Sequence, residues 1–127
     1  MKSFISKIRE KLGHDKFVHP AGRILIENEK GEFLFIHRAD NGLLGIPAGG
    51  LEENETIEEC IKREVYEETG IKLKNLTTIG ISSNPKTQTV NYLSGDVNQL
   101  FSSIIIYHRF KPNNFIQLYD WDISSFI

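Results

Sequence analysis

One segment, residues 56–69, has the pattern of an amphipathic helix and constrains what the rest of the chain can fold into. Thr56 and Glu59 form a capping-box pattern at its start, and Gly70 stands where a helix would end. Apolar residues recur at every fourth position between them, namely Ile57, Ile61 and Val65. A helix with one apolar face must bury that face against another element. The sequence therefore predicts a helix packed against a partner layer.

The partner layer is expected to be a β-sheet, because most other apolar segments are short and bounded by turn residues. The order of helices and strands indicates the α/β class, with a mixed sheet and helices packed on its faces. The predicted elements are a helix over 2–12, strands over 24–26, 33–36, 72–81 and 99–110, a loop over 38–45, a brief extended segment over 46–48 and turns over 27–31 and 94–96. Residues 111–127 have no clear period, and no element is predicted there.

The composition excludes several classes of protein. A chain of 127 residues is expected to form one domain of ordinary size, spanning residues 1–127. Its 15 Lys and Arg against 17 Asp and Glu, a net charge of −2, argue against a surface that binds nucleic acid. The lone Cys60 cannot form an internal disulfide. The apolar runs are too short for a membrane span or a signal peptide, so no membrane contact is expected and the expected location is the cytoplasm.

The acidic residues are unevenly spread along the chain. Eight of the 17 lie between Glu52 and Glu68. On the predicted helix, Glu64, Glu67 and Glu68 follow the i, i+3, i+4 spacing that puts three like charges on one face. One interpretation is a solvated face on which Arg63 pairs with neighbouring glutamates. The other is a site for a hard cation such as Mg²⁺, which takes carboxylate oxygens together with substrate phosphates.

The spacing around these glutamates separates the two interpretations. From Gly49 the chain has five residues before Glu55, then seven residues, then Arg63-Glu64-Val65-Tyr66-Glu67-Glu68-Thr69-Gly70-Ile71. This segment resembles the Nudix box, and it meets every defined position of that motif. The resemblance implies an α/β/α sandwich around a mixed β-sheet. It also implies hydrolysis of the diphosphate in a nucleoside diphosphate linked to another group, with divalent cations.

The resemblance also implies a catalytic and metal-binding set. Glu64 and Glu68 would be the main ligands of Mg²⁺, with Mn²⁺ as the alternative, and Glu67 would complete the cluster. Ala48, just before the first glycine of the box, would add its backbone carbonyl. Cations held in this way neutralise charge on the diphosphate and lower the pKa of the attacking water. A carboxylate beside the metal would accept the proton, and the resemblance leaves Glu64 and Glu67 as alternatives for this general base.

Four further positions of the box have implied supporting roles. Arg63 would orient the glutamates and belongs to the catalytic set. Glu55 would support the metal site. Gly49 and Gly70 would be backbone positions, where a side chain would crowd the turn.

His37 and Arg38, just before the loop, are candidates for binding a substrate phosphate, and Arg38 is the better suited because its guanidinium can form two parallel hydrogen bonds. The alternative is that both are solvated groups at the edge of the sheet. The sequence does not name the substrate, and a small nucleotide derivative is the expected class.

The C-terminal region departs from the family pattern. Only residues 111–127 remain where such domains continue into a helix that covers the sheet, and Pro112 lies near their start. We therefore expect the C-terminal helix to be incomplete or missing. An uncovered sheet exposes apolar surface, which with family analogy predicts a homodimer.

Two other functions stay open beside the hydrolase. One is a catalytically impaired Nudix scaffold, with a shortened C-terminus, that binds nucleotides or regulates. The other is an enzyme acting on the 5′ end of RNA, against which the charge balance argues.

Overall fold

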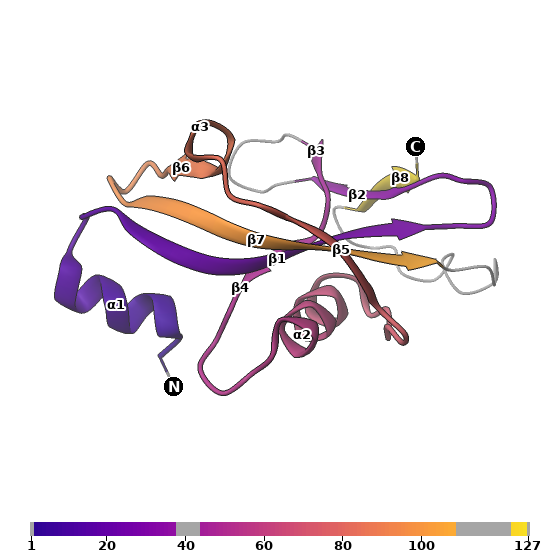
Figure 1. Ribbon diagram of the computed structural model, residues 1–127, viewed down its shortest axis with the longest axis horizontal. Coiled ribbons are helices and arrows are strands. Elements are labelled where there is room, and N and C mark those ends of the chain that lie inside the picture. The colour runs from indigo at the N-terminus through magenta and orange to yellow at the C-terminus, as the bar shows by residue number, and fades with distance from the viewer. Residues whose placement is uncertain (1, 38–43, 109–122, 127) are drawn as a thin grey trace.

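The computed structural model describes residues 2–37, 44–108 and 123–126, which form two β-sheets and three helices (Figure 1). In chain order the elements are α1 (Phe4–Leu12), β1 (Phe17–Glu27), β2 (Leu34–His37), β3 (Leu44–Gly45), β4 (Ala48–Gly50), α2 (Ile57–Thr69), β5 (Thr77–Ser82), α3 (Pro85–Gln88), β6 (Thr89–Asn91), β7 (Val97–His108) and β8 (Ile123–Phe126).

The larger sheet is mixed. Its strands follow the order β4-β1-β7-β5, and β6 also pairs with β7. The long central strands β1 and β7 run parallel over all 11 residues of β1, with Ile24 opposite Ile105, whereas β4, β5 and β6 pair antiparallel. The smaller sheet, β3-β2-β8, is antiparallel. These sheets and their helices confirm the expected α/β class.

Helix α2 confirms the prediction for residues 56–69. Thr56 caps its start, and both hydrogen bonds of the capping box with Glu59 form. Gly70 ends the helix in the left-handed conformation, with φ 75°, which a glycine adopts without steric cost. The apolar face of α2 packs on the larger sheet and completes the core. The fully or nearly buried residues of this core are Ile24, Ile26, Leu34, Ile61, Val65, Ile71, Leu73 and Ile105.

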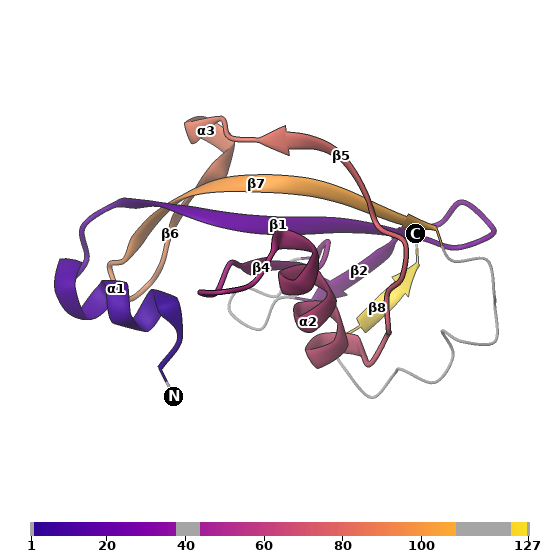
Figure 2. The ribbon, with the colours of Figure 1, turned by 60° about the horizontal axis from the view of Figure 1, so that its bottom comes forward.

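The helices lie on both sides of β1 and β7. Figure 2 shows α1 and α2 below these strands and α3 above them. Helix α1 confirms the helix expected over 2–12, and the Ser3 side chain caps it by accepting from the backbone N–H of Ser6. The Phe4 backbone N–H also donates to a Glu52 carboxylate oxygen at 2.7 Å. The N-terminal helix is therefore attached to the loop that precedes α2.

Several predicted boundaries are wrong. The strand expected over 24–26 begins at Phe17, because Pro20 and Gly22 interrupt the pattern of β-forming residues that precedes it. The strand expected over 72–81 begins only at Thr77. Helix α3 and strand β6 were not predicted, and β3 lies at the end of the segment expected to be a loop. Each of these elements is too short to give a periodic signal.

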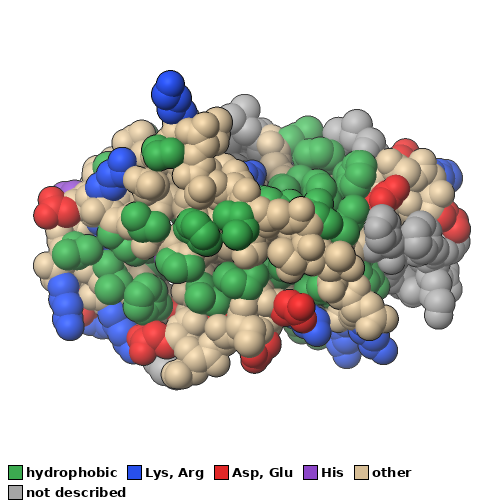
Figure 3. All heavy atoms as spheres, in the orientation of Figure 1, with side chains coloured by type: hydrophobic (Ala, Val, Ile, Leu, Met, Phe, Trp, Pro, Cys, Tyr) green, Lys and Arg blue, Asp and Glu red, His purple; other side chains and the backbone are tan. Residues whose placement is uncertain are grey.

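The expectation of a missing C-terminal helix concerns residues that lie mostly outside the described part of the chain. Within that part, Ile123–Phe126 form β8 and pair with β2, where no element was predicted. No helix among the described residues is long and apolar enough to cross a membrane. Apolar side chains stand exposed on the larger sheet, among them Val18, Ile81 and Phe101, and hydrophobic atoms extend across the face seen in Figure 3.

Candidate functional site

Strand β4 and helix α2 lie in close contact, with Gly49 of the strand against Glu64 of the helix. A Cβ at Gly49 would overlap the side chain of Glu64, so only glycine leaves room for that carboxylate under the strand. The thiol of the fully buried Cys60 lies 3.4 Å from the carbonyl oxygen of Gly50, to which it donates. Small residues at this contact therefore let the helix present its glutamates directly beside the strand.

Arg63 connects the carboxylates of the segment. Its guanidinium donates to both oxygens of Glu55, at 2.8 and 3.1 Å, and to Glu64 at 2.8 Å. A longer ion pair of 3.6 Å reaches Glu67. The hydrogen bonds from Arg63 hold the pKa of Glu55 below its ordinary value, and the same contacts raise the pKa of Arg63. Glu55 also accepts from the backbone N–H of Glu52 at 2.9 Å, which fixes the loop before α2.

Glu68 is the carboxylate without a partner. Its Oε2 atom is buried and forms no hydrogen bond to the described residues. Burial, followed by the charges of Glu64 and Glu67, raises the pKa of Glu68 to about 7. Three acidic groups on one helix face therefore repel one another, and Glu68, whose buried oxygen has no hydrogen bond among the described residues, carries the cost. Such a group is stabilised by a cation.

The carboxylates of α2 differ from a formed cation site in their geometry. Among the described residues, no three His, Cys, Asp or Glu side chains are gathered closely enough to hold a metal ion as they stand. The reason is visible in the contacts: Glu64 is directed to Arg63 rather than to Glu68. The donor chemistry nevertheless fits a hard divalent cation, since every group offered is a carboxylate oxygen and Oε2 of Glu68 has no other partner.

A cleft of about 1040 Å³ opens beside these carboxylates. At one end, Glu67 and Glu68 line it together with Ala48 and Gly49 of β4. Glu64, covered by Gly49, is not among the lining groups of the described part of the cleft. His37, a candidate for binding a substrate phosphate, lines the same cleft from the end of β2. Arg38 lies outside the described residues.

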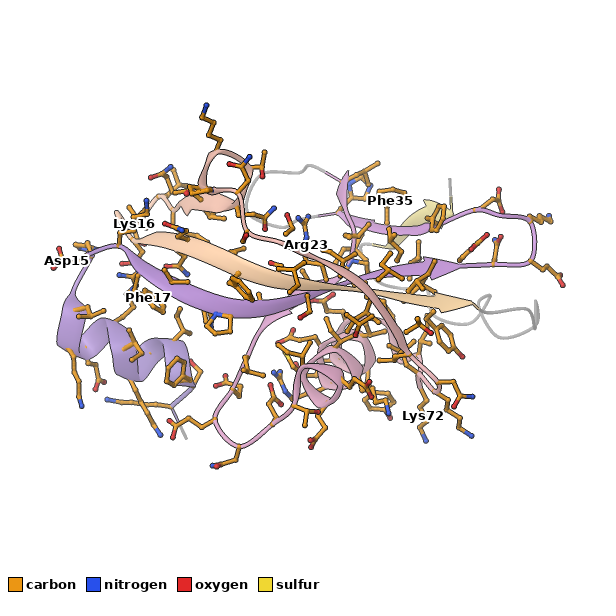
Figure 4. The ribbon with its side chains drawn as sticks, viewed as in Figure 1. Asp15, Lys16, Phe17, Arg23, Phe35 and Lys72 are labelled. Carbon is orange, nitrogen blue, oxygen red and sulfur yellow. The ribbon has the colours of Figure 1, made fainter. Side chains whose placement is uncertain are left out.

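Arg23 is a site residue that sequence reasoning missed. It lies on β1 opposite Ala48 of β4, and its side chain lines the cleft. No carboxylate in the described part of the chain forms an ion pair with it. Figure 4 shows Arg23 in the middle of the molecule, on the side of the strands away from α2. A signal existed in principle, because a strand from Phe17 would have placed Arg23 next to the box, but that strand was not foreseen.

The far end of the cleft is built from other elements. His19 of β1, Gln88 of α3 and Asn98 of β7 line it, and all three are at least nine-tenths buried. Ile5 and Arg9 of α1 close the same end. These positions lie far apart in the sequence, and no motif joins them. The cleft thus has an acidic end at the box and, near α1, an end lined by buried polar side chains, where the charged Arg9 and Asp96 pair with each other.

Comparison with known proteins identifies the family. The NUDIX domain matches residues 18–121. The NAD-capped RNA hydrolase NudC of Vibrio parahaemolyticus is 34% identical over 98 residues, which cover 72% of this chain and 38% of that protein. The ADP-ribose pyrophosphatase of Methanocaldococcus jannaschii is 35% identical over 86 residues, 64% of this chain and 50% of that protein. The chain thus spans half or less of the length of these relatives.

Solved structures agree with the sequence comparison. The MutT protein of Methanosarcina mazei superimposes with a TM-score of 0.55 at 27% identity, covering 89% of this chain and 75% of that chain. The box at residues 49–71 and its helix lie within the matched region, as do all lining residues of the cleft except Ile5 and Arg9. The chain therefore belongs to the Nudix domain family.

Proposed function

We propose that this chain hydrolyses a diphosphate linkage in a small nucleoside diphosphate derivative. The observation that carries the proposal is that Glu67, Glu68 and Arg23 face one cleft. A diphosphate needs both kinds of group, because carboxylates hold the cation and a guanidinium binds a phosphate oxygen pair. The hydrolase names of the relatives support the same reaction class.

Mg²⁺, or Mn²⁺ in its place, is the proposed cofactor. Glu67 and Glu68 would hold it with Glu64 and the Ala48 carbonyl, and when bound it supplies neutralisation of phosphate charge. Arg63 keeps the glutamates in place through its contacts with Glu64 and Glu67. Because Glu64 leaves Arg63 in order to join such a site, binding of the cation is expected to be coupled to a turn of that side chain.

The two candidates for the general base differ in access. The side chain of Glu67 is 58% exposed and lines the cleft, whereas that of Glu64 is 22% exposed and covered by Gly49. A base must come within hydrogen-bond reach of the attacking water. We therefore propose Glu67 as the group that accepts the proton. Arg23 and His37 are positioned to orient the phosphates.

The decisive experiment is product release from a panel of compounds. The panel contains ADP-ribose, NAD, dinucleoside polyphosphates, nucleotide sugars and nucleoside triphosphates, each with Mg²⁺ or Mn²⁺. Cleavage of one class, lost in Glu68→Gln and retained in Glu58→Gln, is the expected result. Glu58 is the matched control because it lies exposed on the same helix and outside the cleft. Equal activity in the two variants would contradict the proposal.

The alternative of a scaffold without turnover is favoured by one observation, the engagement of Glu64 by Arg63. It predicts that a nucleotide stabilises the folded protein against heat and that no product appears with any member of the panel. NAD-capped RNA belongs in the panel as a separate arm, since one relative acts on it. A homodimer, a cytoplasmic location and a single domain over residues 1–127 stay predictions. Size-exclusion chromatography with light scattering tests the first.

A further inference from the structure

The polar end of the cleft contains buried groups whose hydrogen-bonding capacity is not used. His19 is 6% exposed, Gln88 5% and Asn98 4%. Buried polar groups in native proteins are almost always hydrogen-bonded, because an unmade bond costs free energy. Groups of this kind that line a cleft therefore indicate a ligand.

The orientation of Asn98 is fixed by Arg9. The guanidinium can only donate, so the carboxamide oxygen of Asn98 must face it, and the two are hydrogen-bonded. Arg9 is itself held by the carbonyl oxygens of Val97 at 2.9 Å and Asp15 at 2.7 Å, and it stacks over the Phe17 ring. The NH₂ group of Asn98 is left without an acceptor among the described residues. It is a positioned donor in the cleft wall.

Gln88 presents a second donor. Its carboxamide oxygen accepts from the hydroxyl of the fully buried Ser102 at 3.3 Å. The short helix α3, capped by Asn84 and begun by Pro85, brings Gln88 to this position over β7. Its NH₂ group likewise has no acceptor in the described part of the chain. Two carboxamides from different elements thus offer their N–H groups to the same space.

His19 presents an acceptor. Its ring lies against Gly50, where a Cβ would stand 2.8 Å from Nε2, and it stacks on Phe17 with ring centroids 5.4 Å apart. The Nε2 atom is buried and has no partner among the described residues. Burial lowers the pKa of His19, although the backbone of Leu51 opposes this by hydrogen bonding to the ring. A neutral imidazole has one nitrogen free to accept.

Among the described residues, the two charged groups that line this end, Arg9 and Asp96, are already paired. Asp96, on the rim, is paired with His14 at 2.8 Å and lies 3.6 Å from Arg9.

The distance from this end to the box also suits a nucleotide. His19 lies four residues before Arg23 on the same face of β1, which is roughly 13 Å at the rise of a strand. A phosphate at Arg23 would leave its nucleoside directed toward His19.

We propose that His19, Gln88 and Asn98 form the subsite that binds the nucleobase of the substrate through its hydrogen-bonding edge. The identity of the ligand rests on the proposed function, but binding does not require catalysis. Two donors and one acceptor match an uncharged heterocycle that carries both ring nitrogens and an exocyclic group. A second phosphate or a carboxylate is a poorer match, because Arg9, the cation that the described residues place here, is already bonded to Asn98 and to two carbonyl oxygens.

The test compares ligands that differ only in the base. Isothermal titration calorimetry in EDTA measures the affinity of the full chain for AMP, GMP, CMP, UMP and ribose 5-phosphate. We expect at least one nucleoside monophosphate to bind about 25-fold tighter than ribose 5-phosphate, since two hydrogen bonds of about 1 kcal/mol each contribute about fivefold apiece. If none binds more tightly than ribose 5-phosphate, or if none binds, the proposal is wrong.

Two variants locate the contact. Asn98→Asp keeps the oxygen that Arg9 needs and removes the donor, and Gln88→Leu removes the second donor. Each is expected to weaken binding of the preferred monophosphate about fivefold and to leave ribose 5-phosphate unchanged. Gln99→Glu is the control, because Gln99 follows Asn98 on β7 and points to the opposite face.

The outcomes also separate this proposal from the proposed function. Base-dependent binding that both variants retain in full would place the base elsewhere and overturn the subsite. Base-dependent binding that the variants lose, in a chain that cleaves nothing in the panel, would support the subsite while refuting the enzyme. Circular dichroism of each variant confirms that it is folded before its affinity is compared.

Discussion

Replacing Glu68 with Gln is expected to stabilise the metal-free protein above neutral pH. Burial and the charges of Glu64 and Glu67 raise the pKa of Glu68 from 4.5 to about 7. At about 1.4 kcal/mol per pKa unit, holding the ionised carboxylate in the folded state costs on the order of 3 kcal/mol before solvent screening. The side chain is only partly buried, so the expected gain in the free energy of unfolding is ~1–2 kcal/mol.

The gain depends on pH, because only the ionised carboxylate is disfavoured. Between 4.5 and about 7 the folded state binds the Glu68 proton more tightly than the unfolded state does. The contribution of Glu68 to the free energy of unfolding therefore falls as the pH rises through this window. Wild type and Glu68→Gln should be equally stable below it and differ fully above it.

Urea denaturation in EDTA, followed by circular dichroism at about pH 4 and about pH 8, measures the stability below and above this window. Glu58→Gln, exposed on the same helix, should change neither. With Mg²⁺ in place of EDTA, wild type should become more stable than Glu68→Gln, since a ligand of the folded state stabilises the chain that binds it more tightly. A Glu68→Gln protein that is less stable than wild type at the higher pH, or that differs equally at both, would refute the reasoning.

Three further substitutions test the residues that hold the carboxylates of α2 in place. Gly49→Ala should abolish hydrolysis and lower the melting temperature, because the new Cβ overlaps the carboxylate beneath it, whereas Gly80→Ala, with open space around it, should do neither. Arg63→Lys keeps the charge but loses the two-pronged contact with Glu55, so the free energy of unfolding should fall by ~1–2 kcal/mol in urea titrations; an unchanged midpoint would show that the contact contributes nothing. Thr56→Ala removes the helix cap and should lower the free energy of unfolding by about 1 kcal/mol, measured by thermal unfolding. An unchanged melting temperature would contradict this expectation.

The part of the fold that could be predicted is the part encoded locally. The apolar spacing predicts helix α2, Thr56 predicts its start and Gly70 predicts its end. Each of these signals lies within the helix or directly beside it. The start of β1 could not be predicted in this way. Pro20 and Gly22 disfavour a strand, and they are tolerated because β7 and β4 pair on either side of that segment. Pairing of this kind joins residues that a sequence window never contains.

The same distinction between local signals and long-range pairing applies to the residues of the site. The box glutamates and Arg63 are close in sequence, so their spacing was sufficient to assemble them. Arg23 reaches the box only because β1 lies beside β4. Gln88 and Asn98 line the same cleft because α3 lies beside β7, and no periodic pattern in the sequence predicts this arrangement. The glutamates proposed to hold the cation were therefore foreseeable, whereas Arg23 and the groups proposed to bind the base were not.

The parallel pairing of β1 with β7 has a consequence for how the protein is made. Phe17 lies opposite Asn98, and the box lies between these two strands in the chain. Closing so long an intervening segment costs chain entropy before any contact compensates for it, and such topologies fold slowly. On the ribosome, α2 can form early, but β1 keeps an open edge until β7 has emerged, and open strand edges pair with other chains. We expect the nascent protein to be prone to aggregation after the box has been made and before its cleft exists.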